Sequence, residues 1–174
     1  MARLPYATLD HAEAQALVER IVAERGSVLH LYQMLLHSPP LAAGWLNYMT
    51  AVRHKLALSG ALRELIIMRV AILNGAPYEA EQHAPIALKE GVTQAQLDAL
   101  ADGPDAAVFD ASERAVLRLT DAMTREIHFA PEIVAAVREQ LGERGTIEAT
   151  ATIAAYNMVS RFLEALQIHS HDER

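Results

Sequence analysis

The apolar residues of this chain recur at intervals of three and four positions, which is the spacing of one face of an α-helix. The segment 61–73 is apolar on nearly every side, so we expect other helices to surround it. No stretch shows the strict alternation of a half-buried strand. The longest regular segment, from residue 146 to residue 168, carries apolar side chains at helical spacing: Ile147, Ala151, Ala154, Met158, Phe162 and Ala165. The pattern predicts an all-α fold.

Capping residues divide the chain into about nine predicted helices. Prolines in first turns and glycines just after last turns mark several of the boundaries. Capping boxes mark further starts at Asp10 with Glu13, Thr93 with Gln96, and Asp110 with Glu113. The predicted helices cover residues 11–25, 28–37, 39–57, 61–73, 77–90, 94–101, 111–127, 131–142 and 146–168. They predict a compact orthogonal bundle of about eight or nine helices.

Length and composition are consistent with one domain. The chain has 174 residues, which is enough for a sizeable core, so we predict a single domain over residues 1–174. Hydrophobic residues make up 52% of the chain and aromatic residues only 5%. Ala and Leu supply most of the difference, and both residues favour close-packed helices over a sheet.

The net charge and the apolar segments limit the partners. A formal net charge of −7 argues against nucleic acid or an anionic membrane, because both require a concentrated basic face. The most apolar stretch, residues 65–73, is interrupted by Arg69 and has only about half of the roughly 20 residues that cross a bilayer. The first residues lack the long apolar segment of a secretion signal. We therefore expect a cytoplasmic protein that acts on a small-molecule substrate.

The chain contains no cysteine. Disulfides, thiolate metal ligands and cysteine nucleophiles are therefore excluded by composition alone. Any chemistry of this protein must use oxygen and nitrogen groups, and carboxylates and imidazoles are the obvious candidates.

The segment 62–91 combines a charged pair that opens an apolar helix, an Asn-Gly stop, and an aromatic residue, a histidine and a glycine in the next helix. The residues are Arg63-Glu64, Asn74-Gly75, Tyr78, His83, Ala87 and Gly91, with further matches at His37-Ser38-Pro39, Tyr156-Asn157-Met158 and Arg161-Phe162. In these features the chain resembles the carboxymuconolactone decarboxylase-like superfamily, which includes alkylhydroperoxidase D. The resemblance covers most of the chain and implies an AhpD-like helical fold. It also implies a homo-oligomer, either a trimer or a hexamer.

The resemblance also shows what this chain lacks. In the thiol-dependent branch of the superfamily, a Cys-x-x-Cys pair begins the second helix of the motif, and a Glu and a His relay protons. Here Ala76 and Glu79 occupy the two cysteine positions, whereas the relay residues are present as Glu64 and His83. Peroxide reduction by a thiolate requires sulfur at those positions. The sequence is therefore closer to the decarboxylase branch, which implies that the reaction needs no metal or organic cofactor.

The residues themselves point to acid–base chemistry. Glu79 and His83 are four positions apart, so on a helix they share a face and can touch. A carboxylate beside an imidazole orients one ring nitrogen, and the pair can act as a general base or a proton relay. The alternative is a solvent-exposed contact of no functional importance.

Glu64 is the second candidate because apolar residues flank it on both sides. A carboxylate in such a segment is buried unless it lies on the first exposed turn of the helix, where it would complement the helix dipole. We expect a buried polar cluster with His83. The alternative is a first-turn residue that needs no function.

Three further residues complete the candidate site. Arg63 or Arg69 can hold a substrate carboxylate as a bidentate fork, and a helix–helix ion pair is the structural alternative for each. Tyr78 can stabilise a developing enolate with its hydroxyl, and its alternative is an amphipathic residue at the start of a helix.

The sequence favours an enzyme over a binding protein. The leading prediction is a cofactor-independent lyase of the carboxymuconolactone decarboxylase type that acts on a small oxygenated, carboxylated molecule. Its catalytic residues would be Glu64, Glu79, His83 and Tyr78. Two alternatives stay open: a peroxidase-related protein that has lost its thiols and only binds a ligand, and a metal-dependent hydrolase or isomerase that uses the carboxylates and His83 as ligands.

Overall fold

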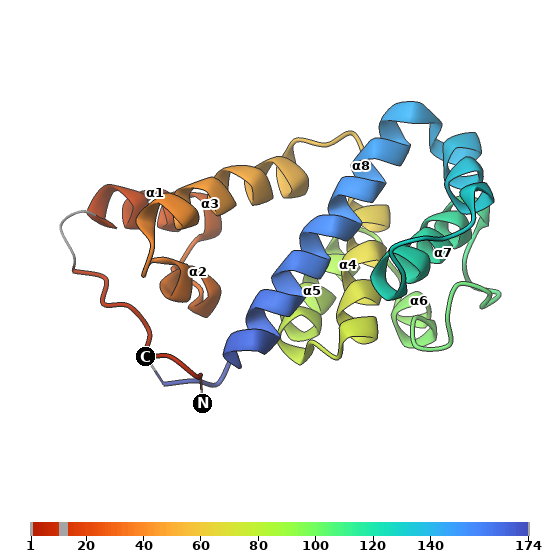
Figure 1. Cartoon of the computed structure of the whole chain (residues 1–174). Helices are drawn as coiled ribbons and strands as arrows, with labels where there is room; N and C mark the ends of the chain where they lie inside the picture. Colours follow the sequence, from red (N-terminus) through yellow and green to blue (C-terminus); the bar gives the residue numbers. More distant parts are fainter. Residues whose placement is uncertain (1, 11–13, 174) are drawn as a thin grey trace. The chain divides into compact units, whose positions relative to one another are not determined.

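The computed structural model describes residues 2–10 and 14–173, and within these ranges it contains eight helices and no strand (Figure 1). The all-α prediction is confirmed. The helices are α1 (Gln15–Arg25), α2 (His30–Leu35), α3 (Pro39–His54), α4 (Gly60–Asn74), α5 (Pro77–Lys89), α6 (Gln94–Ala99), α7 (Ala111–Arg125) and α8 (Pro131–Leu166).

The local capping chemistry explains most of the helix boundaries. Thr93 and Asp110 each accept a hydrogen bond from a backbone N–H group of the first turn, and each forms the reciprocal capping box that the sequence predicts. Gly75 ends α4 in the left-handed conformation with φ 60° and ψ 40°, which a residue with a Cβ atom rarely adopts. The capping box predicted for Asp10 and Glu13 lies outside the described residues, because residues 11–13 are not described.

Gly142 divides the longest element. The sequence predicts a helix stop at this residue, and Gly142 has a non-helical backbone with φ 68° and ψ −176° inside α8. The helical segments on its two sides correspond to the predicted helices 131–142 and 146–168. In α5, Pro85 lies inside a continuous helix, where it lacks the N–H group for one helical hydrogen bond.

The chain forms two compact units. The first unit contains residues 1–55 and 162–174, and it includes α1, α2 and α3. The second unit contains residues 56–161, and it includes α4 to α7 and α8 as far as residue 161. The single domain expected over residues 1–174 stays a prediction.

In the first unit, both ends of the described chain lie side by side. The Arg3 side chain donates to the carbonyl of Ala165 over 2.9 Å, and the Arg3 backbone donates to the carbonyl of Leu166 over 2.8 Å. Trp45 of α3 packs against Phe162, with ring centroids 5.3 Å apart. These contacts tie the end of α8 to the first helices of the chain.

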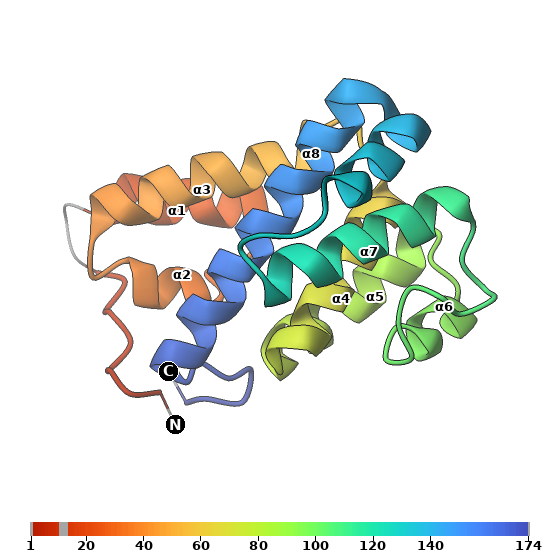
Figure 2. The same cartoon turned by 45° about the vertical axis from the view of Figure 1, so that its right-hand side comes forward.

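The second unit is built around α4, which packs against α5 and α7 (Figure 2). Its residues from Glu64 to Ala71 are all buried, as the apolar character of the segment predicts. Burial of this kind is the main favourable contribution to folding, about 25 cal/mol per Å² of apolar surface. The buried apolar cluster of this unit contains Leu65, Met68, Ala87, Val92, Leu100, Phe109 and Leu117.

Hydrogen bonds fix the direction of α8 relative to α4. Just before α4, the backbone N–H of Leu58 donates to Oε2 of Glu148 over 2.7 Å. At the end of α4, Nδ2 of Asn74 donates to Oδ1 of Asn157 over 3.0 Å, and Nδ2 of Asn157 donates to Oγ1 of Thr124 over 3.0 Å. The two helices therefore run in the same direction, since the earlier residue of α8 lies at the start of α4 and the later one at its end.

Within the described residues, no helix has both the length and the apolar character that crossing a membrane would require.

Arg69 connects α4 to α7. Its Nε and Nη2 atoms donate to the two carboxylate oxygens of Asp121 over 2.6 and 2.7 Å, and its Nη1 atom donates to the carbonyl of Leu100. Arg69 is 4% exposed, so its charge depends on these partners rather than on water.

We expect Asp121→Ala to lower the free energy of unfolding by about 3 kcal/mol, because it leaves the buried Arg69 guanidinium without its counter-charge. Urea denaturation measures the change. The matched control is Asp105→Ala, which removes an ion pair with Arg118 whose side chains are 77% and 56% exposed. The control should change stability little. An equal loss in both variants would contradict the structural importance of the Arg69 pair.

Candidate functional site

The α4–α5 pair brings Glu64 and His83 together. Ser59 caps α4 by accepting a hydrogen bond from the backbone of Leu62, and the left-handed turn at Gly75 reverses the chain so that α5 lies against α4. Glu64 lies beyond the first turn of α4 and is 1% exposed. The first-turn alternative for this residue is therefore wrong, and the expectation of a buried carboxylate is correct.

Glu64 accepts two hydrogen bonds in the interior. Nδ1 of His83 lies 2.7 Å from Oε2 of Glu64, and Nε of Arg63 donates to Oε1 over 3.1 Å. Nη2 of Arg63 also lies 3.4 Å from Oε1 of Glu90. Both carboxylate oxygens of Glu64 thus have a basic partner, which is the condition for keeping a buried carboxylate ionised.

Burial and the two basic partners have opposite effects on the pKa of Glu64. Burial alone raises the pKa of a carboxyl group, because it disfavours the charged form. The hydrogen bond from His83 and the positive charges of His83 and Arg63 outweigh burial, so they hold the pKa of Glu64 below its ordinary value. Glu64 is therefore a carboxylate at neutral pH, and it can stabilise a positive charge on the His83 ring.

Glu79 lies on the other side of the His83 ring. Nε2 of His83 is 3.7 Å from Oε2 of Glu79, which is within the range of an ion pair but too long for a hydrogen bond. Glu79 is 4% exposed and His83 is 5% exposed. The alternative of a solvent-exposed contact is therefore wrong for this pair.

Tyr156 of α8 is the site residue to which the sequence assigned no role. Its ring meets the His83 ring at 90°, with centroids 5.2 Å apart, and the residue is 2% exposed. This edge-on packing restricts rotation of the imidazole, so that Nδ1 stays on Glu64 and Nε2 stays on the side of Glu79. Position 156 belongs to the motif resemblance, but only the packing of α8 on α5 reveals its contact.

Tyr78 and Arg69 fall into different surroundings. Tyr78 begins α5 next to Glu79 and is buried, with 4% exposure. Its role in stabilising an enolate stays a prediction. Arg69 donates to Asp121 and to the carbonyl of Leu100. Its contacts are therefore those of a helix–helix ion pair, the structural alternative to a substrate-binding role.

The cluster is arranged for proton transfer. Glu64 accepts the Nδ1–H of His83 in either protonation state of the ring, so Nε2 is the nitrogen that can exchange a proton. A second carboxylate at 3.7 Å is in reach to receive that proton or supply it. No group of three His, Asp or Glu side chains with the geometry of a metal site occurs in the described part of the chain.

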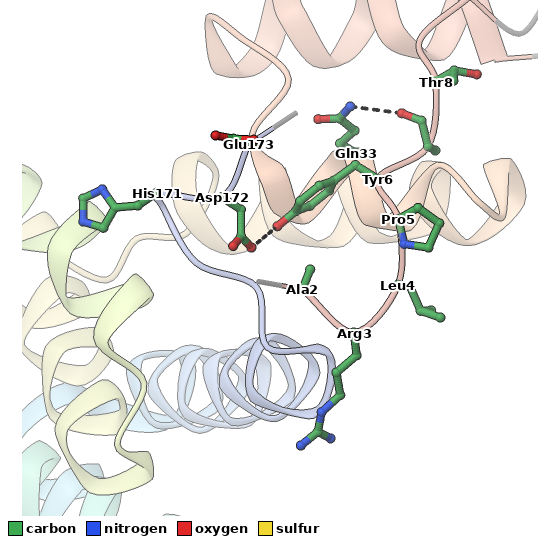
Figure 3. Close-up of a pocket in the computed structure, with 11 residues that line it drawn as sticks. Ala2, Arg3, Leu4, Pro5, Tyr6, Thr8, Gln33, His171, Asp172 and Glu173 are labelled. Atoms are coloured by element: carbon green, nitrogen blue, oxygen red, sulfur yellow. Dashed lines mark hydrogen bonds between the residues drawn. The ribbon is translucent and has the colours of Figure 1, made fainter.

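A separate pocket of about 1000 Å³ lies in the first unit. Figure 3 shows its lining, in which the Tyr6 hydroxyl donates to Oδ2 of Asp172 over 2.7 Å and Nε2 of Gln33 donates to the carbonyl of Ala7 over 3.0 Å. The lining consists of residues 2–8, Gln33 and residues 171–173. None of the predicted site residues contributes to it.

The sequence segment that contains Glu64, Glu79 and His83 matches a known protein family. Residues 39–122 match the model of the Carboxymuconolactone decarboxylase family. The segment contains α3 to α6 and most of α7, and therefore Glu64, Glu79 and His83. No curated protein shows significant sequence similarity to the chain.

Solved structures share the fold. An uncharacterized peroxidase-related protein from Silicibacter sp. TM1040 is 19% identical, with a TM-score of 0.81 over 95% of this chain and 88% of that chain. Another, from Ralstonia eutropha JMP134 and described as an alkylhydroperoxidase AhpD core, is 19% identical, with a TM-score of 0.83 over 98% and 93%. A variant of the debrominase Bmp8 in complex with 2,3,4-tribromopyrrole is 17% identical, with a TM-score of 0.80 over 98% and 94%. At these identities the similarity establishes the fold, and the predicted AhpD-like fold is confirmed.

We expect Glu64→Gln to destabilise the protein by about 1–3 kcal/mol at pH 7, because it removes the charge that faces Arg63 and His83. The folded pKa of Glu64 lies below its ordinary value of 4.5, so the unfolded chain binds more protons there. The carboxylate thus stabilises the fold above pH 4.5, and the contribution is lost as the pH falls through the folded pKa.

Urea denaturation of both proteins between pH 7 and pH 3.5, roughly one unit below that ordinary value, tests this prediction. The stability difference should shrink as the medium becomes acidic. Glu139→Gln, at an exposed position of α8, serves as the control and should show little difference at any pH. A difference for Glu64→Gln that is constant with pH would contradict the ionised state of the buried carboxylate.

Proposed function

We propose that this chain, which matches the Carboxymuconolactone decarboxylase family over residues 39–122 and contains no cysteine, is a cofactor-independent acid–base enzyme of the decarboxylase type. Its substrate is a small oxygenated molecule that carries a carboxylate. The observation that carries the proposal is the buried arrangement of His83 between Glu64 and Glu79, at 2.7 and 3.7 Å. Buried titratable clusters of this kind are costly to fold and are concentrated at functional sites.

In the proposed reaction, His83 moves the proton. The bond between the substrate carbon and its carboxylate breaks, CO2 leaves, and the electron pair that remains on the substrate takes a proton from Nε2 of His83. Glu64 stabilises the imidazolium before this step and keeps the ring in place during it. Glu79 then supplies the next proton to Nε2 from the medium, which restores the starting state. Each turnover consumes one proton and releases one CO2.

The negative charge that develops on the substrate needs a positive or hydrogen-bonding group. Tyr78, at the start of α5, and Arg63, beside Glu64, are the candidates for this role. Arg63 already contacts Glu64 and the partly exposed Glu90, and its contact with Glu90 is the longer at 3.4 Å. A substrate carboxylate can therefore replace Glu90 without disturbing the Glu64 pair.

A second candidate is a protein that binds a small organic ligand without turnover. The peroxidase-related neighbours and the debrominase, which is bound to a brominated pyrrole, favour a small-molecule site in this fold. Without cysteine, this chain cannot perform thiol chemistry on such a ligand. The metal-dependent hydrolase or isomerase has less support, because no three-ligand group occurs within the described ranges.

We also propose a cytoplasmic homo-oligomer, a trimer or hexamer. Several large apolar side chains are exposed on this chain, as is usual where subunits meet. They include Leu41 at 51%, Tyr48 at 42%, Leu88 at 46% and Ile147 at 70%. Light scattering of the purified protein distinguishes these assemblies from a monomer.

We expect His83→Ala to reduce kcat for γ-carboxymuconolactone by about 10²–10⁴-fold, because the proton donor is lost. Release of CO2 under saturating substrate measures the rate. The matched control is His128→Ala, at an exposed position, and it should retain activity. Full activity of His83→Ala would contradict the assignment of His83 as the residue that transfers the proton. A natural chain that binds the lactone but releases no CO2 would favour the binding protein.

We expect no peroxide consumption by the natural chain in the presence of thiol reductants, because a cysteine thiolate is the group that attacks peroxide in such reactions. Loss of hydrogen peroxide and of tert-butyl hydroperoxide measures the rate. The double variant Ala76→Cys/Glu79→Cys restores sulfur at the two motif positions and serves as the comparison. Robust turnover by the natural chain would overthrow the proposal that the site works without thiols.

A further inference from the structure

The buried face of α8 that contains Tyr156 continues beyond the His83 contact. Residue 160 follows Tyr156 by four positions, so it lies on the same face about 6 Å further along the helix. Ser160 occupies this position and is 1% exposed.

The directions of the helices determine which part of α5 Ser160 faces. The contacts of Glu148 and Asn157 show that α8 runs parallel to α4, whereas α5 returns antiparallel to α4 after Gly75. One turn back along α5 leads from His83 to Glu79, and one turn forward along α8 leads from Tyr156 to Ser160. Because α5 and α8 run in opposite directions, both steps point toward the α4–α5 turn. Ser160 and Glu79 therefore lie at the same end of the cluster.

The hydroxyl of Ser160 is buried and has no hydrogen-bond partner among the described residues. The two buried threonine hydroxyls on α8 are satisfied within the helix: Oγ1 of Thr152 donates to the carbonyl of Glu148 over 2.7 Å, and Oγ1 of Thr146 donates to that of Gly142 over 2.7 Å. A buried hydroxyl without a partner costs about 1–3 kcal/mol. Such groups are few in native structures, and a role in catalysis or ligand binding is one reason for keeping one.

We propose that Ser160 is a specificity-determining residue that hydrogen-bonds a polar atom of the substrate beside His83. The inference rests on the proposed function, since it places the same substrate between α5 and α8. Tyr156 forms the apolar wall of the site, and Ser160 supplies the hydrogen bond at its end.

The charges near Ser160 and Glu79 limit which part of the substrate can bind there. Glu79 is the charged side chain at this level of α5, whereas Arg63 lies with Glu64 and Glu90. A substrate carboxylate is repelled by Glu79 and attracted by Arg63. The group at Ser160 is therefore an uncharged polar group, such as a lactone carbonyl or a hydroxyl, which accepts from the Ser160 hydroxyl or donates to its oxygen. The substrate class is a small molecule with a carboxylate at one end and an uncharged polar group at the other.

Because the chain has no cysteine, a single introduced thiol reports on access to one position. We expect the Ser160→Cys variant to react with methyl methanethiolsulfonate at least about tenfold faster than the Ala149→Cys variant under native conditions, since only the former thiol borders a ligand site. Ala149 lies on the same helix and is 0% exposed. Mass spectrometry of the intact protein over time measures both rates. Equal, slow rates would overturn the proposal.

A second variant separates a ligand-binding hydroxyl from a structural one. Ser160→Ala should leave the Tm of the free protein unchanged or raise it, because it removes an unpaired buried group. It should weaken binding of γ-carboxymuconolactone about tenfold, with Thr152→Val as the control of unchanged affinity. A lower Tm, or unchanged affinity, would contradict the proposal. The thiol reaction does not require turnover, so it can succeed or fail independently of the His83→Ala assay.

Discussion

The hydrogen bond between Glu64 and His83 is the interaction on which the candidate site depends. It places an ionised carboxylate and an imidazole in the interior, where each would be costly without the other. Arg63 supplies the second partner of the carboxylate, so the pair keeps a fixed geometry and a low pKa at Glu64. Nδ1 of His83 is engaged in the hydrogen bond to Glu64, so Nε2 is the ring nitrogen that can exchange a proton.

The rest of the second unit holds this pair in place. The turn at Gly75 lays α5 against α4, and the Arg69–Asp121 ion pair fixes α4 on α7. Asn157 then joins the end of α4 to α7 and α8, and this sets the register at which Tyr156 meets His83. Polar contacts outside the cluster thus determine which residues of α8 face α5.

The two cysteine positions of the thiol-dependent branch show how one fold can support a different reaction. Sulfur at position 79 would provide a nucleophile, whereas Glu79 places a carboxyl group, which can carry a proton, 3.7 Å from His83. The resemblance implies the same carboxylate–imidazole pair in both cases. Under the proposed function, exchange of the residue in front of the relay replaces thiol redox chemistry with proton transfer, and Ser160 would give the same site a means of selecting its substrate.

The sequence by itself determined the helical class, the helix boundaries at Thr93, Asp110 and Gly142, and the absence of thiol chemistry, because periodicity, capping and composition are local properties. It also pointed to Glu64, Glu79 and His83, through helical spacing and the motif. Only the tertiary structure decided that these three are buried together, that Arg69 pairs with Asp121, and that Tyr156 packs on His83. These contacts join residues far apart in the chain, and they depend on the packing of α4, α5, α7 and α8 rather than on any local pattern.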